Sequence, residues 1–79
     1  MKFSVGENVS LQVPLPYLKT ADSISVLRPP DLVSLDEVGV IIGIRPNDLI
    51  EVQFRRGNFL IPSERLKILG YDNRQLNET

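Results

Sequence analysis

The pattern of apolar and polar residues predicts short β-strands in three parts of this chain, two by alternation and one by its β-branched residues. Residues 8–13 form the first, where apolar side chains alternate with polar ones at Val9, Leu11 and Val13. Residues 50–55 give the clearest alternation, with apolar side chains at Ile50, Val52 and Phe54. Residues 38–45 are rich in β-branched side chains but contain two glycines, which is typical of a strand with a bulge, a bend or a close backbone approach.

Turn-forming residues divide the second half of the chain into hairpins. Residues 46–48 (Pro-Asn-Asp) and 56–58 (Arg-Gly-Asn) predict two turns. A fourth strand is expected over 58–61, a 3₁₀-like turn over 62–65 and a fifth strand over 66–69. The pattern predicts an all-β fold, a small five-stranded SH3-like barrel with a long first loop. The alternative is a five-stranded OB-type barrel, which has longer strands and often a helix between the third and fourth.

Residues 14–37 form that long first loop. Its prolines remove backbone donors and disfavour helix in the residues before them: Pro14, Pro16, Pro29 and Pro30. A connection of about 24 residues is far longer than the usual 2 to 6 and is normally functional or disordered. We expect this one to pack onto the barrel, because it carries eight large apolar residues: Tyr17, Leu18, Ile24, Val26, Leu27, Leu32, Val33 and Leu35.

Two interpretations of this loop stay open. In the first, the loop is a preformed partner-binding surface, with Tyr17 as an aromatic anchor and Lys19 and Arg28 as cationic contacts. In the second, the prolines only pin the loop, and its charges pair with each other. Such pairs would join Arg28 to Asp31 or Lys19 to Asp22. The two interpretations are compatible, since a pinned loop presents a defined surface.

The length allows one small domain. A 79-residue chain without cysteines buries only roughly 60% of its unfolded surface and must form one compact core. We predict that this domain covers residues 1–69 and that the polar residues 70–79 form a flexible tail. The apolar runs are far shorter than the roughly 20 residues that span a bilayer, and residues 1–7 lack a signal-peptide pattern. We therefore expect a soluble, cytoplasmic monomer without membrane insertion.

The amino-acid composition argues against most kinds of enzymatic catalysis. The chain contains no His, Cys or Trp. Imidazole and thiolate groups supply the usual general bases near neutral pH, the thiol nucleophiles and the soft metal ligands. The adjacent carboxylates Asp36 and Glu37 would point to opposite faces of an extended segment and so would not converge on one atom. We expect no enzymatic activity, no catalytic residue, no cofactor and no metal site.

The charge balance argues against nucleic acid as a partner. The chain has nine Lys and Arg residues and ten Asp and Glu residues, which gives a net charge of −1. Arg45, Arg55 and Arg56 gather near hairpin ends, but Phe54 and Phe59 are expected in the core rather than free to stack on bases. A nucleic-acid module of KOW or Tudor type is therefore the weakest interpretation.

Two runs of the loop resemble the small cyanobacterial family of NblS-interacting proteins, SipA. These runs are residues 16–22 (Pro-Tyr-Leu-Lys-Thr-Ala-Asp) and residues 27–32 (Leu-Arg-Pro-Pro-Asp-Leu). The resemblance continues through the strands, at Gly39, residues 43–46, Val52, Phe54, residues 56–57 and residues 59–60. At this spacing the two loop runs are specific, whereas the pattern of glycines and valines in the strands is not.

This resemblance implies a non-enzymatic SH3-like adaptor. Such a protein would bind the ATP-binding domain of an NblS-type sensor histidine kinase and stimulate its autophosphorylation in stress signalling. It would do so by binding the active arrangement of the kinase more tightly than the inactive one. Position by position, the resemblance implies these candidate partner contacts: Tyr17, Lys19, Thr20, Asp22, Arg28, Pro29, Pro30, Asp31 and Arg45.

The strand framework also resembles the SH3-like peripheral subunit of photosystem I and a similar subunit of the photosynthetic NDH complex. The shared positions are residues 37–39, 52–54 and 64–66. Those subunits lack the two loop runs. The alternative function is accordingly that of an accessory subunit of a photosynthetic electron-transfer complex, of photosystem I or NDH type.

Overall fold

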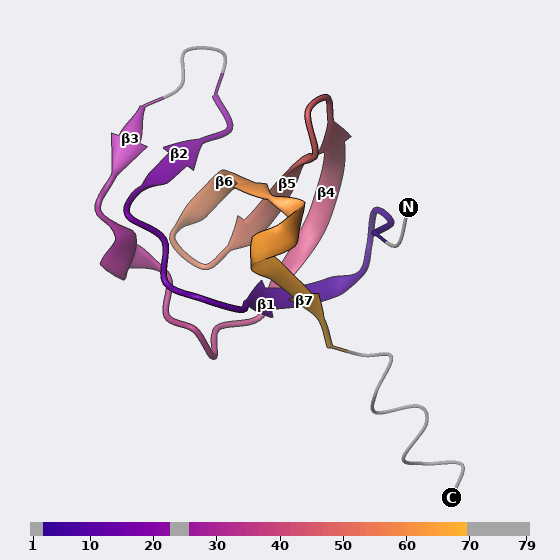
Figure 1. The fold of residues 1–79 in the computed structure, drawn as a ribbon, viewed down its shortest axis with the longest axis horizontal. Coiled ribbons are helices and arrows are strands. Elements are labelled where there is room, and N and C mark those ends of the chain that lie inside the picture. The colour runs from indigo at the N-terminus through magenta and orange to yellow at the C-terminus, as the bar shows by residue number, and fades with distance from the viewer. Residues whose placement is uncertain (1–2, 23–25, 70–79) are drawn as a thin grey trace, which may run out of the picture.

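The computed structural model describes residues 3–22 and 26–69, which form an all-β domain (Figure 1). Its strands are β1 (Asn8–Leu11), β2 (Leu18–Thr20), β3 (Leu27–Arg28), β4 (Gly39–Arg45), β5 (Leu49–Phe54), β6 (Gly57–Pro62) and β7 (Leu66–Ile68). Two 3₁₀ turns accompany them, η1 (Pro30–Leu32) and η2 (Ser63–Arg65). The predicted fold class is confirmed, with seven strands in place of five. The predicted tail over 70–79 lies outside the described residues.

All seven strands belong to one antiparallel sheet, in the order β3-β2-β6-β5-β4-β1-β7. The sheet curls into a half barrel around the apolar core (Figure 1). Because β1 pairs with both β4 and β7, it joins β7 to the central strands. The core consists of twelve buried apolar residues: Val9, Leu11, Leu15, Leu18, Val33, Ile41, Ile50, Val52, Phe54, Phe59, Ile61 and Leu66.

Strands β4, β5 and β6 form a meander that supplies half of this core. The alternation predicted over 50–55 is confirmed, and the rings of Phe54 and Phe59 lie in the core with their centroids 6.5 Å apart. The bend predicted in β4 is confirmed as a register shift between Ile41 and Gly43. Gly39 marks a close approach, since a Cβ there would lie 2.6 Å from Cγ1 of Val52.

Both predicted hairpins form, with one boundary corrected. In the first turn, Asn47 and Asp48 adopt φ values of 65° and 61°, which short polar side chains tolerate better than most. The second turn consists of Arg55 and Arg56, and Gly57 already pairs with Phe54 as part of β6. The chain turns one residue earlier than predicted because Gly57 pairs across the hairpin in spite of its positive φ of 147°.

The long first loop predicted over residues 14–37 contains short elements that the sequence pattern did not predict. Residues 12–38, which we call the connection, contain β2, β3 and η1. The two strands have three and two residues, too few to show an alternation. β2 is held by pairing with a strand distant in sequence, since its Lys19 lies opposite Leu60 of β6, and β3 pairs with β2. The first strand is also shorter than predicted, because it ends at Leu11 and Val13 is exposed.

The apolar residues of the connection pack onto the core only in part. Leu15, Leu18 and Val33 are buried, and Leu32 is half-buried. Four others predicted to pack down are instead exposed at the surface: Tyr17, Val26, Leu27 and Leu35. Ile24 lies outside the described residues. The connection therefore covers the core with a few side chains and presents the rest to the surroundings.

Candidate partner-binding site

A groove lies where the start of the connection meets β5, β6 and η2. It has a volume of about 270 Å³ and is lined by Leu15, Pro16, Tyr17, Lys19, Leu49, Leu60, Pro62 and Arg65. Small-molecule sites usually have volumes of about 300–1,000 Å³ and enclose their ligand. This groove is smaller and open at the surface, so it is suited to side chains of a partner protein.

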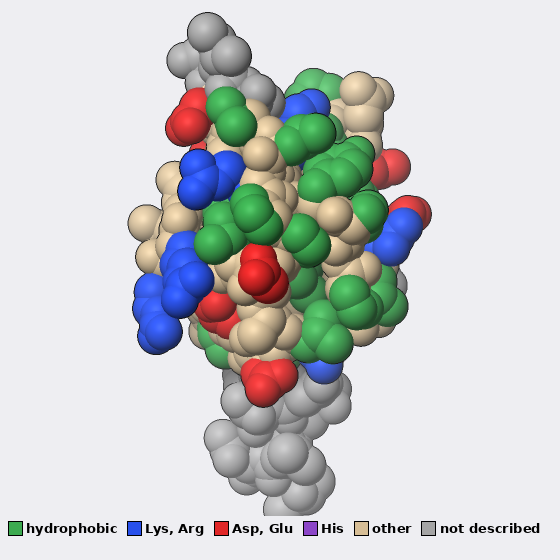
Figure 2. Space-filling model, turned by 90° about the vertical axis from the view of Figure 1, so that its left-hand side faces the viewer, with side chains coloured by type: hydrophobic (Ala, Val, Ile, Leu, Met, Phe, Trp, Pro, Cys, Tyr) green, Lys and Arg blue, Asp and Glu red, His purple; other side chains and the backbone are tan. Residues whose placement is uncertain are grey.

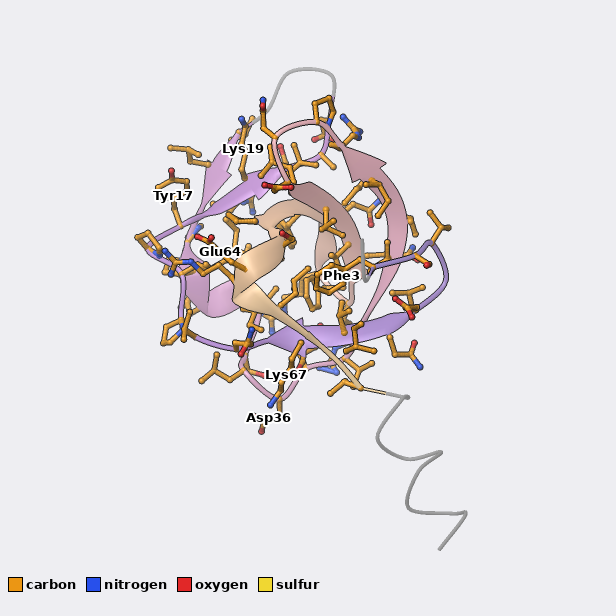
Figure 3. The ribbon with its side chains drawn as sticks, turned by 45° about the vertical axis from the view of Figure 1, so that its right-hand side comes forward. Phe3, Tyr17, Lys19, Asp36, Glu64 and Lys67 are labelled. Atoms are coloured by element: carbon orange, nitrogen blue, oxygen red, sulfur yellow. The ribbon has the colours of Figure 1, made fainter. Side chains whose placement is uncertain are left out.

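Tyr17 forms part of one wall of the groove, and the buried leucines on either side of it fix its position. Leu15 and Leu18 point into the core, and Tyr17 between them remains 51% exposed. Figure 3 shows Tyr17 and Lys19 on the same flank of the molecule. Strand pairing builds the opposite wall, since Leu49 of β5 lies opposite Pro62 of β6. The apolar surface of the groove is therefore assembled from three separate parts of the chain.

Gln12 fastens the beginning of the connection to η2. Its backbone N–H donates to the carbonyl of Arg65 at 2.7 Å. Its side-chain Nε2 donates to the carbonyl of Leu66 at 2.9 Å and to that of Glu64 at 3.2 Å. These bonds span more than 50 residues of sequence and hold the start of the connection against η2 and the beginning of β7.

The groove is lined by two cationic side chains, Lys19 and Arg65, and by no carboxylate. Within residues 3–22 and 26–69, Lys19 forms no ion pair. Arg65 approaches the carboxylate of Glu64 at 3.8 Å, with both side chains exposed, a geometry that contributes little in water. The groove therefore combines an apolar surface with positive charge.

Three more predicted contacts lie around a second hollow of about 230 Å³. Thr20, Asp22 and Arg28 line it together with Arg56 and residues 57–59, among others. The hydroxyl of Thr20 accepts a hydrogen bond from the N–H of Val26 at 2.8 Å, which holds the two arms of the β2–β3 hairpin together.

The ion pairs suggested for the loop are absent from the described part of the chain. Neither Arg28 with Asp31 nor Lys19 with Asp22 comes within 4.0 Å. The connection is instead held by buried leucines and backbone hydrogen bonds, so its charged side chains stay at the surface.

The remaining predicted contacts are separate from both hollows. Pro29 precedes η1, and Pro30 and Asp31 line a third hollow of about 310 Å³. Arg45, at the end of β4, donates to Oε1 of Glu51 from Nη2 at 2.8 Å and from Nε at 3.2 Å. The nine predicted residues therefore do not form one site, and only Tyr17 and Lys19 reach the groove.

Six of the eight groove residues were not predicted as partner contacts: Leu15, Pro16, Leu49, Leu60, Pro62 and Arg65. Leu60 carried a usable signal, because it is an apolar residue between the core positions Phe59 and Ile61 and must therefore face outwards. The contribution of η2 could not be predicted, since it depends on the hydrogen bonds that Gln12 forms across the fold.

Figure 2 shows the side of the molecule on which β2 and β3 lie. Hydrophobic side chains cover much of this face, and charged side chains of both signs lie among and around them, with most Lys and Arg atoms towards the left-hand margin. Tyr17, Val26 and Leu27 are among the exposed apolar residues of the connection. An apolar surface of this kind, bordered by charge, is characteristic of a protein-binding surface.

In residues 3–22 and 26–69, no three acidic side chains come together in a way that would hold a metal ion. No helix in the same ranges has the length and apolar character needed to cross a membrane.

Comparison with known proteins gives one family match. The family model described as "Protein CHLORORESPIRATORY REDUCTION 42-like" matches residues 5–66. A search of curated proteins and a search of solved structures each found no match. The family match overturns the resemblance to the NblS-interacting family, and with it the assignment to two-component signalling. The two loop runs that suggested that resemblance are therefore not diagnostic, and the kinase-adaptor function has no support.

Proposed function

This chain belongs to the chlororespiratory reduction 42-like family, and on that premise we propose that it is a non-enzymatic accessory protein of a photosynthetic electron-transfer complex of the NDH type. The family match over residues 5–66 carries the proposal. A family name built on respiration and reduction favours the NDH type over photosystem I. It agrees with the alternative function that the strand framework suggested.

The composition supports a role through binding rather than electron transfer. The 79 residues contain neither His nor Cys, the side chains that most often hold haem iron, iron–sulfur clusters and zinc. The groove and the exposed apolar residues around it offer a surface for a protein partner. The proposed role is to bind a subunit of the complex through this face. The cytoplasmic location and the monomeric state stay predictions.

Co-purification from solubilised photosynthetic membranes tests this proposal. Tagged wild-type protein is expected to recover NDH-type subunits, and the Tyr17→Ala variant is expected to recover much less of them. Val38→Ala is the matched control, because Val38 is also exposed, at 54%, but lines a different hollow. Recovery of photosystem I subunits alone, or of no electron-transfer subunit, would contradict the proposed function.

A further inference from the structure

The two cations of the groove lie at opposite ends of a path along β6 and η2. Lys19 marks one end, because it pairs with Leu60. Pro62 lies two residues further along the strand, where it pairs with Leu49. Arg65 marks the other end, at the last residue of η2. The middle of the path is apolar and each end carries a cation, with the exposed Glu64 carboxylate 3.8 Å from the Arg65 guanidinium.

The length of this path indicates how many residues of an extended segment can lie along the groove. The two strand residues from Leu60 to Pro62 cover about 6.6 Å at roughly 3.3 Å each. The three residues from Pro62 to Arg65 cover about 6 Å at roughly 2 Å each. A path of about 12 Å corresponds to about four residues of extended chain, in which alternate side chains face the same way.

The charges and apolar side chains of the groove then indicate which residue types a bound segment has at each position. A segment that lies along the groove places the side chains of its residues i, i+2 and i+4 against it. Residues i and i+4 reach the ends, where Lys19 and Arg65 favour carboxylates. Residue i+2 reaches the middle, where Tyr17, Leu49 and Pro62 favour an apolar side chain.

We propose that the groove binds an extended acidic segment of a partner protein, with Asp or Glu at positions i and i+4 and an apolar residue at i+2. The inference rests on the proposed function, since it names the chemistry by which the partner is recognised. The groove is already assembled without the partner, because strand pairing joins β2 and β5 to β6 and Gln12 fastens the start of the connection to η2. Binding therefore requires little reorganisation of this chain.

A peptide titration tests the pattern directly. The test peptide is Ser-Gly-Glu-Ser-Leu-Ser-Glu-Gly-Ser, and the comparison peptide carries Gln in place of both Glu residues. Binding is followed by NMR chemical shifts of the protein amides. The acidic peptide is expected to shift signals around Tyr17 and Leu60 and to bind about tenfold more tightly than the Gln peptide. Its affinity is expected to fall as salt rises.

Charge-reversal variants locate the contact. Lys19→Glu is expected to weaken binding of the acidic peptide about tenfold, because an attractive contact is replaced by a repulsive one. Lys67→Glu is the matched control, since Lys67 is an exposed lysine of β7 that lies away from Lys19 (Figure 3). The control is expected to change the affinity less than about twofold.

A reciprocal exchange of charge gives the sharpest test. The double variant Lys19→Glu/Arg65→Glu is expected to lose the acidic peptide and to bind a peptide with Lys at positions i and i+4. Restored binding shows that the variant protein is folded and that the pairing is charge-specific. Equal binding of the acidic and Gln peptides, equal losses in the Lys19 and Lys67 variants, or no binding of the acidic peptide would overturn the inference.

The two proposals fail in distinguishable ways. When membranes yield NDH-type subunits but the acidic peptide does not bind, the acidic-segment inference is wrong and the proposed function stands. When the peptide binds as expected but membranes yield no such subunits, the proposed function is wrong.

Discussion

The meander of β4, β5 and β6 differs from the connection over residues 12–38 in how it uses apolar side chains. The meander supplies six of the twelve buried apolar residues, although it covers only residues 39–62. The described part of the connection is of similar length and supplies three, Leu15, Leu18 and Val33. Several of its other apolar side chains are exposed. The meander places most of its large apolar side chains in the core, whereas the connection leaves several of its own at the surface.

This difference predicts that equivalent truncations will have unequal effects in the two regions. The largest effect is expected at Phe59, which is 2% exposed and contacts the core from β6. Phe59→Ala is expected to lower the free energy of unfolding by about 3–5 kcal/mol. Urea denaturation followed by circular dichroism measures it, with Phe59→Leu as a milder control. A loss below about 1 kcal/mol would mean that the meander is not the stabilising region.

Within the connection, Leu18 and Leu27 form a matched pair. Leu18 is 1% exposed and Leu27 is 61% exposed, although they lie in the paired strands β2 and β3. Leu18→Ala is expected to cost about 2–4 kcal/mol, because it leaves a cavity in the core. Leu27→Ala is expected to change stability by less than about 0.5 kcal/mol. Similar losses for both variants, measured by the same denaturation, would show that the exposed residues also support the fold.

A smaller effect is expected from overpacking the meander at Gly39. A Cβ there would lie 2.6 Å from Cγ1 of Val52 and 2.7 Å from Cε1 of Phe54. Gly39→Ala is therefore expected to cost about 1–3 kcal/mol, seen as a lower melting temperature. Gly43→Ala serves as the control, because the nearest atom to its Cβ would be Oε1, at the end of the Glu51 side chain, at 3.1 Å. A larger loss for Gly43→Ala than for Gly39→Ala would contradict the packing described for β4.

The smallest effect is expected at Gln12, which fastens the connection to η2. Gln12→Ala removes the hydrogen bonds from Nε2 to the carbonyls of Glu64 and Leu66, at an expected cost of about 1 kcal/mol. Amide hydrogen exchange is expected to rise in η2 more than in β5. Gln53→Ala, at an exposed position of β5, is the control. Unchanged exchange in η2 would show that Gln12 does not hold the groove.

The same comparison explains which parts of the fold could be predicted from the sequence. The meander alternates with a period of two and is joined by short turns, so the sequence of each strand shows which side faces the core. The connection has no such period. Leu18 is buried because Lys19 pairs with the distant Leu60, and Tyr17 is exposed because of the same pairing. Which side chains of the connection are buried therefore depends on strand pairing in the folded sheet, and the local sequence does not reveal it.

The candidate site was predicted only in part for a related reason. Tyr17 and Lys19 lie within the loop that the sequence singled out, and both reach the groove. Arg45 was predicted as a contact but pairs with Glu51. Leu60 and Arg65 complete the groove from the far end of the chain. A groove formed between separate segments is visible only when their pairing is known.

Site-specific cross-linking tests the central claim most directly. A photo-reactive phenylalanine analogue is placed at position 17 in photosynthetic cells that make the protein, and at position 38 as the control. We predict that position 17 becomes cross-linked to a subunit of an NDH-type complex, through an acidic segment of that subunit, and that position 38 does not. Equal cross-linking from both positions, or cross-links from position 17 only to proteins outside that complex, would contradict the account.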